Sequence, residues 1–177
     1  MSRELIARLF QLFVIAAFIA GGCRASQPRQ LPFESLDSSV DDLGYRATEP
    51  ALTVVVSLED VDRLALERSN SSHAEEVGDL LRALDYDEKI AVIVYRGEAP
   101  GTTHTYIPEI TDVLRDGNRI ILRSHFGAPG PNDLIGFEAS YPWHIITISK
   151  ARGWDRAMRF VLEVDREKVT EVKHYVP

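Results

Sequence analysis

The sequence is poor in the residues that build disulfide and metal sites. It contains one cysteine, Cys23, among 177 residues, so no disulfide can form within the chain and the domain must be stabilised by its hydrophobic core. Its five histidines show neither His-x-His nor His-x-x-x-His spacing, the patterns by which one strand or helix presents two metal ligands. We therefore expect no metal site and no cofactor.

Motifs for nucleophilic catalysis and phosphate binding are missing as well. No serine lies in a Gly-x-Ser-x-Gly elbow. The glycine-rich loop at residues 127–136 (GAPGPNDLIG) contains prolines, which lack the backbone N–H donors that a phosphate cradle needs. The net charge of −7 disfavours nucleic acid as a partner, because nucleic-acid binding depends largely on basic residues. We predict no catalytic residues and a protein that is not an enzyme.

The N-terminus departs from this average composition. Arg3 and Arg8 precede an uncharged, mostly apolar run at residues 9–22 (LFQLFVIAAFIAGG). A basic start, an apolar centre and small residues at the end are typical of a signal peptide. The run is also shorter than the roughly 20 apolar residues that span a bilayer comfortably. We predict a signal peptide over residues 1–22.

The lone cysteine follows this run directly, after Ala20, Gly21 and Gly22. The stretch resembles the lipobox of bacterial lipoproteins, in which small residues precede an obligatory cysteine, although the leucine more usual at the position of Ala20 is missing. The resemblance implies that Cys23 receives a diacylglycerol, that the chain is cut before it and that the new amino group is acylated. Several acyl chains hold a protein on a membrane where one chain binds only marginally. The alternative is a signal anchor or ordinary cleavage, with a passive cysteine.

A lipid anchor would place the protein in the cell envelope, with the membrane as its first partner. Its location would be the outer membrane or the outer face of the cytoplasmic membrane. Residues 23–49 are rich in Ser, Pro, Gln and Asp, with scattered apolar residues, a composition typical of flexible segments. We interpret them as a lipid-anchored flexible tether and predict a single domain over residues 50–177.

The rest of the chain mixes strand and helix signals. Residues 51–57 (ALTVVVS) are β-branched and predict a strand. Residues 57–70 and 71–84 carry apolar side chains at helical spacing, and Ser57 with Asp60 is typical of a helix start. About six strands follow, two of them joined in a hairpin by the turn RDGN. The predicted fold is α+β: one mostly antiparallel sheet, barrel- or sandwich-like, with one or two helices near the start of the domain.

Short motifs run through residues 85–150, from YDEKIAVIVYRGEAPGTTHTYIPEI to YPWHIITISK. They resemble the C-terminal domain of the PrcB-type protease complex subunit, a family with an Asp-led strand ending in Gly, a following Pro, a Tyr entering an aliphatic strand and a closing aromatic-Pro-aromatic strand. The matching residues are Asp87, Gly97, Pro100, Tyr106, Ile110, Tyr141, Pro142 and Lys150. The family usually has Gly-Gly before its tyrosine, and the loop GTTHTY replaces it here, which would change any partner contact of this loop.

The resemblance implies a binding or accessory protein that stabilises an exported or surface protease without catalysis of its own. A candidate partner surface can be placed on its aromatic residues. Tyr141 and Trp143 flank Pro142 and would share one face of a strand, beside His104 and Tyr106 in the GTTHTY loop. Tyrosine and tryptophan favour interfaces. The alternative is that this face of the strand packs beneath the helices as core.

Two further functions stay open. An envelope hydrolase or protease inhibitor would use loop histidines, and His104, His125 and His144 would then converge from neighbouring strands. A purely structural envelope lipoprotein would need no site at all. The missing catalytic motifs and the resemblance favour an exported, lipid-anchored accessory protein that binds another envelope protein, such as an exported protease.

Overall fold

The computed structural model describes residues 27–177, except residue 47 and residues 67–71, 132–137 and 151–153. The predicted signal peptide and Cys23 lie outside the described residues. Strands make up 49% of the described residues and helices 15%, consistent with a β-rich α+β fold. The elements follow the chain in the order β1 (Arg29–Gln30), β2 (Phe33–Ser39), β3 (Ala51–Val55), α2 (Leu58–Arg63), α3 (Ser72–Arg82), β4 (Lys89–Tyr95), β5 (Ala99–Pro100), the 3-10 helix η2 (His104–Tyr106), β6 (Glu109–Asp116), β7 (Arg119–His125), β8 (Ala139–Ser140), β9 (Trp143–Ser149), β10 (Arg156–Val164) and β11 (Glu167–Val176).

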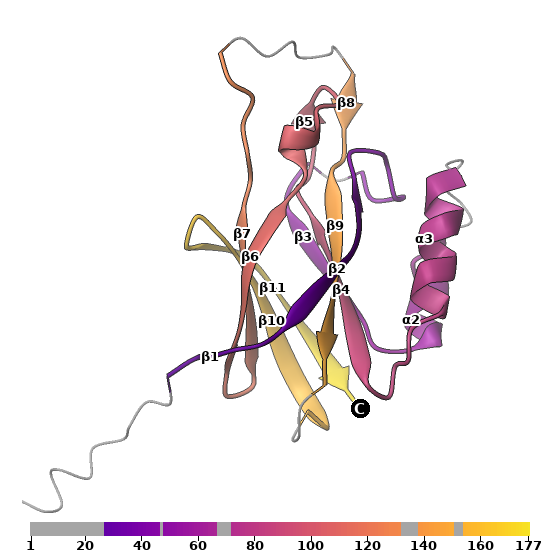
Figure 1. Ribbon diagram of the computed structural model, residues 1–177, viewed down its shortest axis with the longest axis vertical. Coiled ribbons are helices and arrows are strands. Elements are labelled where there is room, and N and C mark those ends of the chain that lie inside the picture. Colours follow the sequence, from indigo (N-terminus) through magenta and orange to yellow (C-terminus); the bar gives the residue numbers. More distant parts are fainter. Residues whose placement is uncertain (1–26, 47, 67–71, 132–137, 151–153) are drawn as a thin grey trace, which may run out of the picture.

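Two sheets form the body of the molecule, with the helices along one side (Figure 1). The five-stranded sheet has the order β1-β6-β7-β10-β11, the four-stranded sheet the order β2-β9-β4-β3, and β5 pairs with β8. All pairs are antiparallel except β7 with β10. The prediction of mostly antiparallel structure is confirmed. The prediction of one sheet is wrong, because side chains of two separate sheets pack against each other, and the described strands form no closed barrel.

The inner core lies between the two sheets. Val92 and Ile146 of the four-stranded sheet meet Val113, Leu122 and Phe160 of the five-stranded sheet, and all five are fully buried. Removing apolar surface from water stabilises a fold by about 25 cal/mol per Å², so this contact is the main reason why the two sheets stay together.

A second core lies between the four-stranded sheet and the helices. Ile93 and Ile145 on the outer face of the sheet pack with Val77 and Leu81 of α3 and with Val61 of α2. The sheet is therefore buried on both faces, which explains why β4 reads as the continuous apolar run KIAVIVY instead of alternating. No helix in the described part of the chain is both long and apolar enough to cross a membrane.

The prediction of a flexible tether up to residue 49 is wrong, because residues 29–39 pair with strands of both sheets. β1 pairs with β6, and β2 pairs with β9 from Phe33 opposite Ile148 to Ser39 opposite Trp143. The segment therefore crosses from one sheet to the other (Figure 1) and belongs to the domain, which begins before residue 50. We call residues 29–39 the bridging segment. Strands at a sheet edge tolerate proline and polar residues because one side of the strand faces water. The bridging segment therefore has a composition that resembles a flexible linker.

A β-bulge also hides the strand pattern of the bridging segment. The register with β9 shifts between Ser35 and Asp37, and an extra residue in one strand reverses which side chains face inward. Ser35, before the shift, lies opposite Ile146 of the inner core, whereas Asp37, two residues later, lies opposite Ile145 of the outer core. The apolar residues therefore do not recur with a period of two.

Both β-hairpins of the five-stranded sheet have two-residue turns. The predicted RDGN hairpin is confirmed: Asp116 pairs with Arg119, and Gly117 has a φ of +60° that suits glycine. In the β10–β11 hairpin, Asp165 and Arg166 have φ values of 51° and 72°. Positive φ at both turn positions is the geometry of a type I′ turn, which matches the twist of the flanking strands.

Candidate binding groove

Two of the four predicted partner-binding residues are buried. Trp143 is fully buried in the outer core, where its Nε1 donates a hydrogen bond to the Asp41 carbonyl at 2.8 Å. Tyr106 is 2% exposed, and the Arg96 guanidinium lies 4.8 Å from the centre of its ring. The prediction that both rings face a partner is wrong. Trp143 lies on the outer face of β9, which the helices cover, and Tyr106 is buried at the end of η2 against Arg96.

The other two predicted residues remain accessible but do not share a site. His104 is exposed at the start of η2. Tyr141 is half-buried and lines a hollow of about 400 Å³ whose wall includes Thr102, Glu138 and Arg46 but not His104. The residues chosen from the sequence therefore do not form one partner-binding surface. Cys23, the predicted lipidation site, lies outside the described residues.

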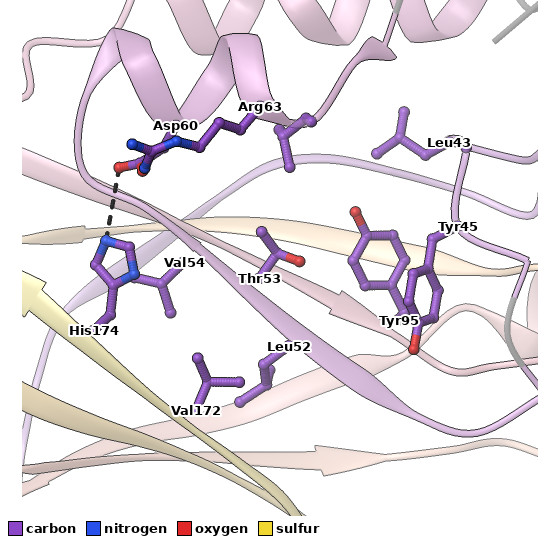
Figure 2. Close-up of a pocket in the computed structure, with 12 residues that line it drawn as sticks. Leu43, Tyr45, Leu52, Thr53, Val54, Asp60, Arg63, Tyr95, Val172 and His174 are labelled. Atoms are coloured by element: carbon purple, nitrogen blue, oxygen red, sulfur yellow. Dashed lines mark hydrogen bonds and ion pairs between the residues drawn. The ribbon is translucent and has the colours of Figure 1, made fainter. Parts of the chain in front are cut away.

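The candidate site is a groove at the edge where β3 and β11 approach each other. Figure 2 shows its lining, which encloses about 410 Å³. β3 is the last strand of the four-stranded sheet, and β11 is the last strand of the five-stranded sheet. Strand residues form the floor, the chain at 43–45 forms one end, and α2 forms the rim. We call this hollow the β3–β11 groove; it is lined by Leu43, Gly44, Tyr45, Leu52, Thr53, Val54, Asp60, Arg63, Leu64, Tyr95, Val172 and His174.

Two tyrosines form one end of the β3–β11 groove (Figure 2). The ring centres of Tyr45 and Tyr95 are 4.5 Å apart, with an interplanar angle of 32°. Tyr95 is 4% exposed, and burial raises the pKa of its hydroxyl above the ordinary value. The phenol is therefore neutral at physiological pH and offers an apolar ring surface with a hydrogen-bonding oxygen, a combination suited to binding.

The opposite end is polar. The Asp60 carboxylate accepts hydrogen bonds from the Val56 N–H, the Ser57 hydroxyl and the Arg63 guanidinium, each at 3.0 Å. Ser57 in turn accepts from the Asp60 N–H at the start of α2, as predicted. His174 of β11 lies 3.7 Å from the same carboxylate (Figure 2), too far for a hydrogen bond but close enough for charge attraction when the ring is protonated.

The backbone of β3 adds a further binding element. Among the described strands, β3 pairs only with β4. In an antiparallel strand, alternate residues direct their N–H and C=O groups to opposite sides, so those of β3 that point away from β4 lie outside the sheet ladder. Beyond the end of the strand, the Val56 N–H is taken by Asp60. A free strand edge beside apolar side chains can accept a further strand.

The remaining histidines do not converge. His125 lies 2.8 Å from the Asp165 carboxylate at the tip of the β10–β11 hairpin, and His144 contacts Ser35 and the Pro108 carbonyl on the bridging edge. Within the described ranges, no three His, Cys, Asp or Glu side chains come together as a metal site would require.

The groove residues were not recognisable from the sequence. Tyr45 falls in the segment interpreted as tether, and Val172 and His174 lie in the last strand, more than a hundred residues from Leu52. The one usable signal was Asp60 three residues after the helix cap Ser57, which placed a carboxylate at the start of α2. That β3 and β11 are both edge strands depends on the sheet order, which no local pattern specifies.

Comparisons with models of protein families, with curated proteins and with solved structures each gave no match.

Proposed function

We propose that this protein is an exported, lipid-anchored accessory protein that binds an extended segment of another envelope protein. The observation that carries the proposal is the β3–β11 groove, in which an edge strand lies beside two tyrosine rings in contact and a polar end. A peptide that adds to a strand edge gains main-chain hydrogen bonds, and neighbouring pockets select its side chains. The groove offers both kinds of contact.

The rest of the proposal is supported by the sequence. The basic and apolar N-terminus with its lipobox-like end supports export and lipidation at Cys23. The resemblance of residues 85–150 to the PrcB-type subunit supports an exported protease as the partner. The chemistry of the groove supports binding over turnover, because the Asp60 carboxylate is occupied by three hydrogen-bond donors from its own neighbourhood.

Photo-crosslinking in the native host tests the binding site. A photoreactive phenylalanine analogue replaces Thr53, which lines the groove, and in a matched strain it replaces Thr111, an exposed threonine on β6. We expect a specific adduct with one envelope protein from position 53, mapped by mass spectrometry to an extended segment of that protein. The partner is then purified and its affinity for the unmodified chain is measured.

The affinity measurement gives the decisive comparison. Tyr45→Ala removes one of the two tyrosine rings and should weaken binding about tenfold or more, since truncation of a tyrosine that anchors an interface often costs over 1 kcal/mol. Tyr175→Ala is the control, because Tyr175 is an exposed tyrosine of β11 outside the groove lining. Equal loss with both variants, or adducts from position 111 alone, would contradict the groove as the binding site.

The anchor is tested separately by mass spectrometry of the mature N-terminus. We expect a chain that begins at Cys23 and carries acyl groups on its thiol and amine. An unmodified Cys23, or a chain that still begins at Met1, would contradict lipid anchoring and would leave the groove proposal unaffected.

A further inference from the structure

A serine and a histidine are hydrogen-bonded on the bridging edge, at the opposite end of the four-stranded sheet from β3. Ser35 Oγ of β2 lies 2.7 Å from His144 Nε2 of β9. The other ring nitrogen, His144 Nδ1, lies 2.8 Å from the backbone carbonyl oxygen of Pro108, just before β6. Three separate segments of the chain therefore fix the position of the imidazole ring.

The two hydrogen bonds determine where the protons are. A carbonyl oxygen can only accept, so His144 Nδ1 carries the ring proton. Nε2 of the neutral ring then holds a lone pair, and the Ser35 hydroxyl is the donor. This is the polarity of a serine nucleophile and its general base, with the Pro108 carbonyl in the orienting position that a carboxylate occupies in a Ser-His-Asp triad.

The surroundings keep the base available. Burial lowers the pKa of His144 below its ordinary value of 6.5, and the Pro108 carbonyl and the Asp37 carboxylate on β2 only partly oppose this effect. The imidazole is therefore neutral at pH 7 and able to take a proton. Ser35 is exposed whereas His144 is half-buried, so a reagent can reach the hydroxyl while the base stays partly shielded from water.

We propose that Ser35 is a nucleophile that takes an acyl group from activated carboxylic esters, with His144 as its general base. Ser35 Oγ attacks the ester carbonyl carbon while its proton passes to His144 Nε2. The bond from that carbon to the leaving oxygen then breaks, and the leaving oxygen takes the proton from Nε2. The products are an ester on Ser35 and the free alcohol. This activity is independent of the β3–β11 groove.

Acetylation of the full chain by p-nitrophenyl acetate tests the proposal. Release of p-nitrophenolate and the masses of acid-quenched peptides report the rate at each serine. We expect Ser35 to be acetylated at least about 100-fold faster than Ser149, an exposed serine on the same strand as His144, because general-base catalysis typically contributes that much. Ser35→Ala should abolish the fast phase, and His144→Gln should slow it about 100-fold.

The rate should also rise with pH as His144 loses its proton and then become constant, a profile that a purely structural hydrogen bond would not produce. Thermal unfolding of both variants shows whether the fold is kept. The Ser35→Cys variant gives a second measurement that does not depend on ester chemistry. Its thiol should react with iodoacetamide at pH 7 about tenfold faster than that of Ser149→Cys, since a neighbouring base favours the thiolate. Peptide masses separate both from Cys23.

Acetylation of Ser35 no faster than that of Ser149 would overturn the proposal, as would equal alkylation of the two engineered thiols. Either result would reduce the Ser35–His144 contact to a hydrogen bond that holds the bridging segment against β9.

Discussion

The two edges of the sandwich differ in how the sheets meet. At one edge the bridging segment pairs first with β6 and then with β9, so a continuous chain joins the two sheets. At the other edge β3 and β11 pass close to each other without pairing, and the β3–β11 groove remains between them. One edge of the molecule is therefore joined by backbone hydrogen bonds, whereas at the other edge β3 and β11 form no such bonds with each other.

This difference predicts that the joined edge contributes more to the stability of the fold and that the open edge contributes to binding. The joined edge buries Leu31 between the sheets and holds His144 between two hydrogen bonds, so changes there should affect the whole fold. The open edge carries half-buried side chains such as Val172 and His174, whose loss the fold should tolerate. Four predictions test this contrast, in order of decreasing expected effect.

Removal of the bridging segment should have the largest effect. A fragment of residues 40–177 lacks β1 and β2 but keeps the groove residues at 43–45, and it exposes the inner-core side chains that the two strands cover. We expect this fragment not to fold, because net stabilities are only about 5–15 kcal/mol and loss of a whole edge exceeds such a margin. Urea unfolding followed by circular dichroism checks this, with residues 27–177 as the control. A cooperative transition in the shorter fragment would show that the joined edge is dispensable.

The same segment shows what the sequence could and could not predict. β4 and the β6–β7 hairpin were predictable, because a continuous apolar run and an RDGN turn are local signals. The bridging segment was not, since its proline and polar residues give the composition of a linker, its bulge interrupts the alternation of a strand, and its partner strand β9 lies about a hundred residues away. Local pattern specifies an element, whereas pairing across the chain decides which residues become an edge.

The same limit applies to the candidate sites. Trp143 was predicted at a partner surface because tryptophan favours interfaces, but the ring fills the space under α3. Ser35 and His144 carry no recognisable motif because they are 109 residues apart. Within the candidate groove, the Ser57 cap with Asp60 is the feature that was predicted correctly, and it is a short-range hydrogen-bond pattern.

Truncation of one buried side chain at each edge gives the next largest effect. Leu31→Ala should lower the free energy of unfolding by about 2–4 kcal/mol, because Leu31 is 5% exposed and its loss leaves a cavity in the inner core. Val172→Ala on the open edge should cost only about 1 kcal/mol, since the side chain is half-buried. Urea unfolding gives both values. A larger cost for Val172→Ala would reverse the assignment of the stabilising edge.

The pH dependence of stability should also reveal the joined edge. Burial lowers the pKa of His144 in the folded chain below the 6.5 of an ordinary histidine. Between the two values the unfolded chain binds a proton that the folded chain does not, so the free energy of unfolding falls as the pH drops below 6.5. The slope from one group is at most about 1.4 kcal/mol per pH unit. Unfolding of wild type and His144→Gln across pH 5–8 isolates it, and identical slopes would contradict the buried, neutral ring.

The smallest effect concerns the turn that leads into the open edge. Arg166 is exposed and has a φ of 72°, a backbone conformation that costs a residue with a side chain more than glycine. Arg166→Gly should therefore raise the free energy of unfolding by about 0.5–1 kcal/mol. Gly117→Ala in the β6–β7 turn is the opposite test: its φ is +60°, and an added Cβ would meet no atom within 4 Å. It should lower the free energy of unfolding by about 1 kcal/mol through backbone strain alone. If both variants changed stability in the same direction, the backbone conformation of the turn would not be what limits the stability of these two hairpins.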